Sequence, residues 1–142
     1  MHKTTMTLLA LACALALSAC GPAEAPHAEA ASASSAGLPD GRIDAGKSLA
    51  NAKGAATGQA CVDCHGADGN TPLDGTYPKL GGQYADYLAY ALQAYRDGKR
   101  AGTGTTDLMA TQAKGLSDQQ IADLAAFFGS QKGELKDLQG AY

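Results

Sequence analysis

Two cysteines and a histidine, Cys61, Cys64 and His65, form the segment of the sequence best suited to chemistry. Two residues separate the cysteines, so in a helical segment their thiols lie about one turn apart. Thiols at this spacing can add to the two vinyl groups of haem, and the histidine that follows can direct its imidazole at the iron. The CxxCH pattern is typical of c-type haem attachment. The sequence therefore predicts one covalently bound haem c, with His65 as an axial iron ligand.

Three other uses of the CxxCH segment compete with haem attachment: a thiol–disulfide motif, half of a zinc site, and a structural disulfide. A thioredoxin-like motif requires neighbouring strands, but the β-branched aliphatic residues are limited to Ile43, Val62 and Ile121. A structural zinc site requires four ligands. Outside this segment and the signal peptide predicted below, only Cys20 and His27 remain as cysteine or histidine donors. These arguments favour haem.

The expected second axial ligand is Met109, the only methionine after residue 19. Met109 follows His65 by 44 residues and lies in a Gly- and Thr-rich stretch, which we predict to be a loop before the last helix. A methionine that fills a gap in the core is the alternative. A thioether favours ferrous iron more than a second imidazole does, so it raises the reduction potential. Histidine and methionine together would leave no open site for oxygen or peroxide.

The elements that must position these residues are predicted to be helices. A first, weakly apolar helix begins at the N-cap Asp44 and ends at Gly54. The clearest helix covers residues 83–97, because its apolar side chains repeat with a period of 3.6, and Gly98 follows as a C-terminal cap. A last helix covers residues 117–129 and opens with a capping box. The sequence predicts an all-α domain with about three to four helices.

Two long connections, residues 66–82 and 98–116, separate the predicted helices. Connections of this length are uncommon in a compact domain without a functional reason. The segment from 44 to 131 is 88 residues long and has few large apolar side chains, so its own core would be marginal. A buried cofactor would supply apolar volume and organise both connections.

The N-terminus has the pattern of an export signal. A short basic region precedes an apolar run over residues 6–17, which is shorter than the about 20 residues that span a bilayer. The run ends at residues 17–20 (LSAC), which resemble the lipobox of bacterial lipoproteins. We expect a lipoprotein signal peptide at residues 1–19 and acylation of Cys20. Ordinary cleavage, for instance after Ala25, and an unprocessed Cys20 are the alternatives.

The segment after the signal peptide, residues 20–42, is rich in Ala, Ser and Pro and is predicted to be a flexible tether. A random coil of about 20 residues reaches roughly 25 Å. The haem domain is expected at residues 43–132, followed by a C-terminal tail at 133–142. Removal of residues 1–19 deletes one charged side chain, Lys3, and changes the formal charge from −3 to −4. No basic patch remains that would indicate nucleic-acid binding.

From about Asp44 to Gln131 the sequence resembles the small class I cytochromes c of bacterial periplasms. The landmarks that carry the resemblance are a helical glycine, the CxxCH segment, a proline-containing stretch before the long helix, a late methionine and an aromatic-bearing last helix: Gly46, residues 61–66, residues 78–83, Met109, Phe127 and Phe128. The resemblance implies the cytochrome c fold around a single haem.

The resemblance also implies how the haem segment is held. The backbone carbonyl of Pro78 is expected to accept a hydrogen bond from the imidazole of His65, which fixes the ring and raises its basicity. Gly46 is expected to let the first helix cross the last one at close range. Phe127 or Phe128 is expected to pack at that crossing.

Further residues are expected around the haem by the same resemblance. Leu80, Tyr87, Leu88 and Leu92 would line the pocket, although core packing alone also explains the last three. Arg96 and Arg100 could meet the haem propionates, and a solvated helix end explains both equally well.

These features predict a single-electron carrier of a periplasmic respiratory chain that is not an enzyme. We expect a monomer, lipid-anchored on the periplasmic side of a bacterial membrane, inner or outer. Its expected partners are redox proteins such as a respiratory complex and a terminal oxidase. The alternative is a haem c enzyme subunit or small-ligand sensor in which Met109 is labile or unbound. A zinc- or thiol-based binding module is a third possibility.

Overall fold

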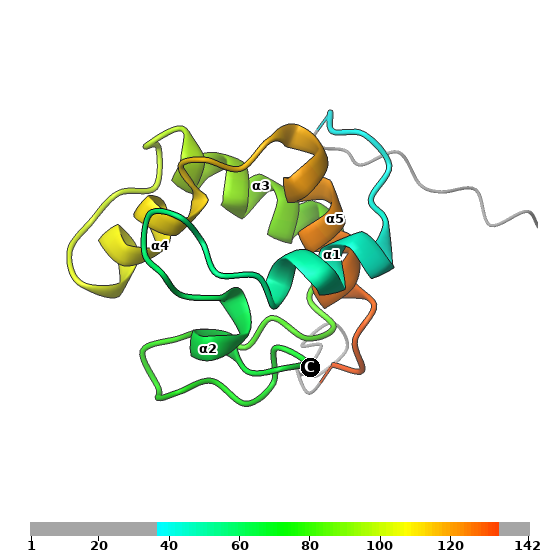
Figure 1. Cartoon of the computed structure of the whole chain (residues 1–142), viewed down its shortest axis with the longest axis horizontal. Helices are drawn as coiled ribbons and strands as arrows, with labels where there is room; N and C mark the ends of the chain where they lie inside the picture. Colours follow the sequence, from blue (N-terminus) through cyan, green and yellow to red (C-terminus); the bar gives the residue numbers. More distant parts are fainter. Residues whose placement is uncertain (1–36, 134–142) are drawn as a thin grey trace, which may run out of the picture. The chain divides into compact units, whose positions relative to one another are not determined.

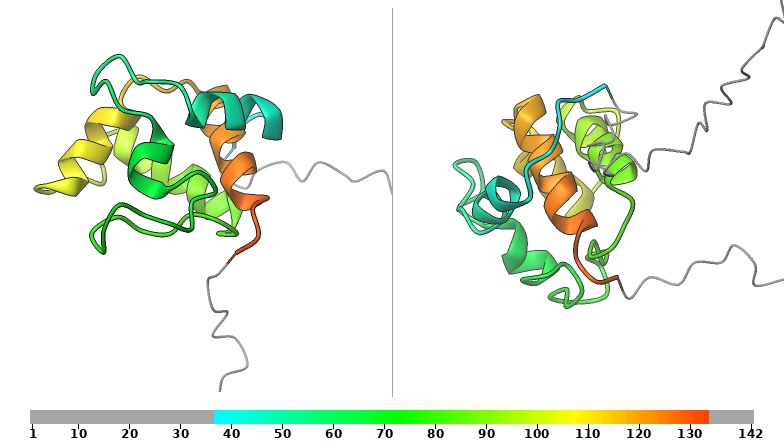
Figure 2. Two further views of the ribbon diagram at one scale, coloured as in Figure 1. Left: turned by 60° about the horizontal axis from the view of Figure 1, so that its bottom comes forward. Right: turned by 90° about the vertical axis from the view of Figure 1, so that its right-hand side faces the viewer.

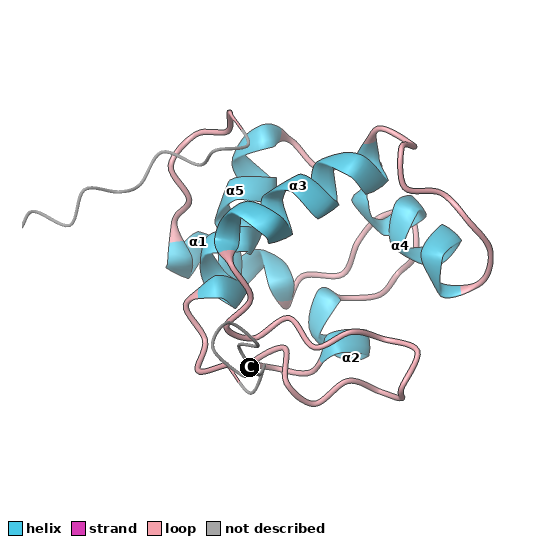
Figure 3. Cartoon of the chain, turned by 180° about the vertical axis from the view of Figure 1, so that it is seen from behind, coloured by secondary structure: helices cyan, strands magenta, loops and turns pink. Residues whose placement is uncertain are grey.

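The computed structural model describes residues 37–133, and this part of the chain is helical without a strand (Figure 1, Figure 3). Five helices follow one another: α1 (Ile43–Ala50), α2 (Cys61–His65), α3 (Ala85–Arg96), α4 (Thr105–Ala113) and α5 (Asp118–Gly129). The predicted all-α class is confirmed. The expected three to four helices become five in the described residues, because the short α2 and α4, which lies in a stretch predicted as a loop, join the three helices placed from the sequence. None of these helices has the length and apolar character needed to cross a membrane.

The first predicted helix is present, but its ends differ from the prediction. Arg42 is the N-cap of α1, so the predicted cap Asp44 lies in the first turn, where its charge suits the positive end of the helix dipole. The backbone N–H of Arg42 donates to the Asp123 carboxylate at 2.8 Å. This tertiary contact, which the local pattern does not contain, accompanies the earlier start. The helix ends at Ala50, before the predicted Gly54.

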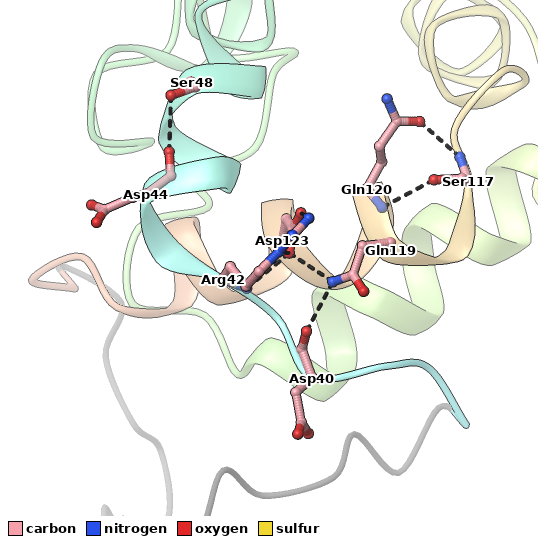
Figure 4. Close-up of polar contacts among 8 residues, drawn as sticks. All are labelled: Asp40, Arg42, Asp44, Ser48, Ser117, Gln119, Gln120 and Asp123. Atoms are coloured by element: carbon pink, nitrogen blue, oxygen red, sulfur yellow. Dashed lines mark hydrogen bonds and ion pairs between the residues drawn. The ribbon is translucent and has the colours of Figure 1, made fainter.

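The predicted ends of α3 and α5 are confirmed to within two residues. Gly98 follows α3 with a φ of 71°, the left-handed conformation expected of a glycine after a helix. At the start of α5, the Ser117 hydroxyl accepts from the Gln120 backbone N–H at 3.2 Å, and the Ser117 N–H donates to the Gln120 side chain at 2.9 Å (Figure 4). The capping box read from the sequence is therefore formed.

Helix α4 corrects the prediction that Met109 lies in a loop. The helix starts after Gly104, whose φ is 63°, and Met109 lies in its middle. One residue of α4, Ala113, is buried. Because the helix buries so little, its sequence lacks a strong apolar stripe, and the Gly and Thr residues before it dominate the pattern.

Helix α5 is the centre of the described fold, and α1 and α3 both pack against it. It contributes seven buried residues: Ile121, Ala122, Asp123, Leu124, Ala125, Phe127 and Phe128. α4 packs on α3, on the other side of this arrangement from α1 (Figure 1, Figure 2). Ile121 and Leu124 are the largest of the fully buried side chains in residues 37–133, so the protein core is small.

The crossing of α1 and α5 depends on a glycine. A Cβ atom at Gly46 would overlap the backbone carbonyl of Asp123 and lie 2.8 Å from the Cβ of Phe127. The two helices therefore approach each other closely, as the resemblance implied. Phe127 is the aromatic residue at the crossing, and its ring lies 4.9 Å from that of Phe128.

The residues just before α1 belong to the packed structure. Leu38 is 7% exposed. The backbone carbonyl of Asp40 accepts from the side chain of Gln119, and the Arg42 guanidinium pairs with Asp123 at 2.8 Å (Figure 4). The expected tether of residues 20–42 thus overlaps the fold at its C-terminal end, since residues 38–42 are held against α5. Residues 20–36 of that segment lie outside the described residues, as does all but the first residue of the expected tail.

Substituting Gly46 with alanine is expected to lower the free energy of unfolding by about 3 kcal/mol, because the new methyl group must force apart two helix backbones. Chemical unfolding followed by circular dichroism measures this change. Gly115→Ala is the matched control: no atom lies within 4 Å of a Cβ built there. An equal loss of stability in the two variants would contradict the proposed close approach.

Substituting Asp123 with asparagine is expected to lower the free energy of unfolding by about 1.5–3 kcal/mol at neutral pH, which is the range for hydrogen bonds to a charged group. The Arg42 side-chain hydrogen bond lowers the pKa of Asp123 below its ordinary value. A carboxyl whose pKa is lower in the folded state stabilises above its unfolded pKa of about 3.9, and this contribution is lost as the pH falls through the folded-state pKa.

The difference in stability between the wild type and Asp123→Asn should therefore shrink as the pH falls below about 4. Denaturant unfolding at a series of pH values measures it. Asp40→Asn serves as a control, because Asp40 contacts Gln119 through its backbone carbonyl. A difference that stays constant down to acidic pH would show that the charge of Asp123 is not what stabilises the contact.

Candidate haem-binding site

A predominantly apolar cavity of about 610 Å³ lies among α2 with its following loop, α3, α4 and α5. This volume falls in the range of about 300–1,000 Å³ that is usual for ligand pockets. Figure 2 shows how these helices are arranged. The lining residues that matter for the site come from each wall: Cys61, Cys64, His65, Tyr77, Pro78, Leu80, Tyr87, Leu88, Leu92, Arg100, Leu108, Met109, Gln112, Leu124 and Phe128.

The imidazole of His65 is fixed on the first wall of the cavity. His65 is only 6% exposed, and its Nδ1 lies 2.9 Å from the backbone carbonyl oxygen of Pro78. The carbonyl can only accept, so Nδ1 carries the hydrogen and Nε2 keeps its lone pair for a metal ion. Burial lowers the pKa of His65, although the bond to Pro78 opposes this, so the ring stays neutral as a ligand must. The ring of Tyr77 stands edge-on, with centroids 6.2 Å apart.

The two cysteines on α2 are free, half-buried and border the same cavity. Burial raises the pKa of the Cys61 thiol to about 11. Thiol–disulfide oxidoreductases need the opposite, a thiolate stabilised by a lowered pKa. The environment of Cys61 therefore disfavours the thiol–disulfide interpretation.

Asp63, between the two cysteines, anchors the start of α2. Its carboxylate accepts from the Ala60 backbone N–H at 2.8 Å and from the Lys53 ammonium at 2.5 Å. These bonds, the Lys53 side chain first, lower the pKa of Asp63. Because α2 has only five residues, the hydrogen bond between the Asp63 carboxylate and the N–H of the N-cap residue Ala60 helps to stabilise the helix.

Met109 reaches the cavity from α4. This helix is separate, in the sequence and in the fold, from the wall that carries His65. Its side chain is partly buried. The structure thus brings an imidazole, two thiols and a thioether around one cavity.

A protein-family model described as cytochrome c matches residues 43–132. The chain belongs to the cytochrome c family. Membership of this family implies covalently bound haem c and electron transfer rather than catalysis. It also agrees with the family resemblance that the sequence landmarks carried.

Individual relatives support the assignment. Cytochrome c-554(548) of Halomonas halodenitrificans is 53% identical over 72 residues, which cover 51% of this chain and 84% of the relative. Cytochrome c4 of Pseudomonas aeruginosa is 48% identical over 89 residues, 59% of this chain and 42% of the relative. The crystal structure of reduced recombinant cytochrome c4 from Pseudomonas stutzeri matches with a TM-score of 0.54 at 30% identity, covering 63% of this chain and 48% of that one. This cytochrome spans less than half of both cytochrome c4 chains.

The residues around the cavity fit haem c. The cavity is large and mostly apolar, as a porphyrin requires, and its polar lining includes two thiols beside a neutral imidazole with a free Nε2. The expected pocket residues Leu80, Tyr87, Leu88 and Leu92 all line it. The hydrogen bond that the resemblance implied between His65 and Pro78 is present.

The structure separates the two arginines that the sequence left equivalent. Arg96 pairs with Asp118 at 2.7 Å and with Asp97 at 3.2 Å, and it does not line the cavity. Arg100 lines the cavity, and its guanidinium lies 4.8 Å from the centroid of the Tyr95 ring. A hydrogen bond with Tyr87 raises the pKa of Arg100 above its ordinary value.

Tyr77 and Gln112 are among the cavity residues that sequence reasoning missed. Tyr77 directly precedes Pro78, so an aromatic residue next to the expected hydrogen-bond acceptor was a usable signal. Gln112 lies three residues after Met109 and shares its side of a helix. That relation was hidden because the stretch was predicted as a loop. Cys20, the expected acylation site, lies outside the described residues.

Proposed function

We propose that this chain is a single-electron carrier of a periplasmic respiratory chain, with one low-spin haem c attached to Cys61 and Cys64 and ligated by His65 and Met109. The observation that carries the proposal is that all four side chains border one apolar cavity, although Met109 comes from a separate helix. The sequence contains a single CxxCH segment, which supports one haem in this chain.

Haem c supplies an iron that changes by one electron between the ferrous and ferric states. The chain's own residues determine how easily this happens. Pro78 holds the His65 ring in one orientation and one tautomer, and the thioether of Met109 favours the ferrous state. Leu80, Leu88 and the other apolar residues of the walls exclude water. Ligands that stay in place in both oxidation states require little rearrangement, which suits a carrier.

Arg100 is the residue we assign to a haem propionate. It is the arginine at the cavity, whereas Arg96 is engaged by Asp97 and Asp118. Its stacking on Tyr95 and its bond with Tyr87 hold the guanidinium in place. A planar guanidinium suits a carboxylate partner.

The N-terminal pattern supports a lipid anchor at Cys20 on the periplasmic side of a membrane, following a signal peptide at residues 1–19. The tether would then connect the anchor to Leu38, the first buried residue of the described fold. Confinement to the membrane surface raises the effective concentration near membrane-bound redox partners, such as a respiratory complex and a terminal oxidase. The haem domain would act as a monomer in transient encounters.

One observation favours a second candidate, a sensor or enzyme subunit that binds a small ligand at the iron. Helix α4, which carries Met109, has a single buried residue. Local opening requires little free energy where few apolar contacts hold an element. A labile Met109 would leave an iron position open.

Carbon monoxide binding to the reduced protein distinguishes the two functions. The wild type is expected to bind it poorly, and Met109→Ala readily, because the substitution removes the sixth ligand. Leu108→Ala is the matched control, since Leu108 lies on α4 and lines the same cavity. The absorption change on carbon monoxide addition measures binding. Ready binding by the wild type would favour the sensor, and weak binding by Met109→Ala would contradict ligation by Met109.

The anchor is tested by labelling cells with a radioactive fatty acid and isolating the protein. We expect label on the wild type and none on Cys20→Ser, because acylation would use the Cys20 thiol. Cys13→Ser provides the matched control, since Cys13 lies within the predicted signal peptide. Unlabelled wild-type protein would contradict the anchor and leave the haem site unaffected.

A further inference from the structure

Helix α4 needs a restraint beyond its apolar packing. Its partner among the helices is α3, and Ala113, near its end, is its buried residue. Met109 lies one turn earlier, in the part of the helix that faces the cavity. The side chain that ligates the iron under the proposed function therefore sits on a weakly packed element.

Gln112 connects α4 to the loop that precedes α2. Its side-chain Nε2 donates to the backbone carbonyl of Gln59 at 3.0 Å, and its Oε1 accepts from the hydroxyl of Thr57. Gly54 lies against this amide: a Cβ atom built at Gly54 would be 2.8 Å from Nε2 of Gln112. Both the NH₂ group and the carbonyl oxygen of the Gln112 amide are therefore hydrogen-bonded to this loop, at the edge of the cavity.

The loop that Gln112 contacts, residues 54–59, is itself held by hydrogen bonds. The Gly54 N–H donates to the Gln59 carbonyl at 2.9 Å, and the Gly58 N–H donates to the Gly54 carbonyl at 2.8 Å. Ala60, the residue after Gln59, donates its backbone N–H to the carboxylate of Asp63 in the CxxCH helix. A continuous set of contacts therefore runs from α4 through residues 54–60 to the segment that carries the cysteines and His65.

Resting on the proposed ligation by His65 and Met109, we propose that Gln112 is a positioning residue that keeps Met109 on the iron. Met109 and Gln112 are three residues apart, so they lie on neighbouring positions of one helix face. When the amide holds this face against residues 54–60, the outward movement of α4 that would withdraw Met109 is opposed. Gln112 thereby sets the fraction of molecules in which the sixth position is open.

Imidazole binding to the oxidised holoprotein tests this role, because imidazole enters only where Met109 has left. The apparent affinity of such a ligand is proportional to the fraction of molecules in the open state. Gln112→Leu keeps the apolar stem and removes both hydrogen bonds. We expect it to bind imidazole about tenfold more tightly than the wild type, which corresponds to about 1.4 kcal/mol.

Thr111→Ala is the matched control on the same helix, since the Thr111 hydroxyl bonds within α4 to the Asp107 carbonyl at 2.9 Å. Its imidazole affinity should equal that of the wild type. Thr57→Val removes the hydroxyl on the other side of the contact and should tighten imidazole binding by a smaller factor. If Gln112→Leu fails to retain haem, Thr57→Val decides the question alone.

Unchanged imidazole affinity in Gln112→Leu or in Thr57→Val would overturn the inference, even if the variant unfolds more easily, because that result describes a merely structural residue. An equal change in Thr111→Ala would overturn it too. The proposed ligation is checked first and separately. If the oxidised wild type lacks the weak far-red absorption that a methionine sulfur gives ferric haem, the ligation itself fails and the inference falls with it.

Discussion

The hydrogen bond from the His65 imidazole to the Pro78 carbonyl joins the two segments that build the first wall of the cavity. A buried imidazole N–H without a partner would cost free energy, so this bond holds the loop after α2 in place as well as the ring. The same loop is fastened by the Leu80 N–H, which donates to the Gly69 carbonyl at 2.7 Å. With Nδ1 committed, Nε2 is the nitrogen whose lone pair is left for a metal ion. The chemistry of the site and the path of its longest connection therefore depend on one contact.

The small core explains why the cavity and the fold are interdependent. Helix α5 contributes more buried apolar residues than any other helix of residues 37–133, and α1 reaches it only because Gly46 has no side chain at the crossing. Leu124 and Phe128 of α5 then face two environments, the helix core and the cavity. Filling the cavity with an apolar group extends the core across α3 and towards α4. A cofactor in this position stabilises the chain as well as giving it a redox centre.

Local signals in the sequence were sufficient for some elements and not for others. The apolar stripe of α3 and the capping box at Ser117 are encoded within a few residues, so both were predictable. The ion pair of Arg42 with Asp123 joins residues 81 apart in the chain, and no local pattern reveals it. Met109 was singled out by its chemistry, and its ligation of iron stays a prediction; its helix was missed, since α4 buries one residue and lacks a clear period. Gln112 could not be found without that helix.

Under the proposed ligation by Met109, the difference between a carrier and a ligand-binding haem protein depends on how firmly α4 is held. Apolar packing of α4 is slight, whereas the polar contact through Gln112 ties it to the loop before α2. A helix held in this way can keep a ligand in place without deep burial. The same arrangement allows sequence changes far from the iron to alter the occupancy of its sixth position.

The visible absorption spectrum of the purified holoprotein, oxidised and then reduced, tests the central claim most directly. We predict one haem per chain, a sharp α band on reduction, and in the oxidised state the weak far-red band of methionine-bound ferric haem. A haem c spectrum without the far-red band would contradict ligation by Met109. A protein that matures in a haem-attaching host without acquiring haem would contradict the account as a whole.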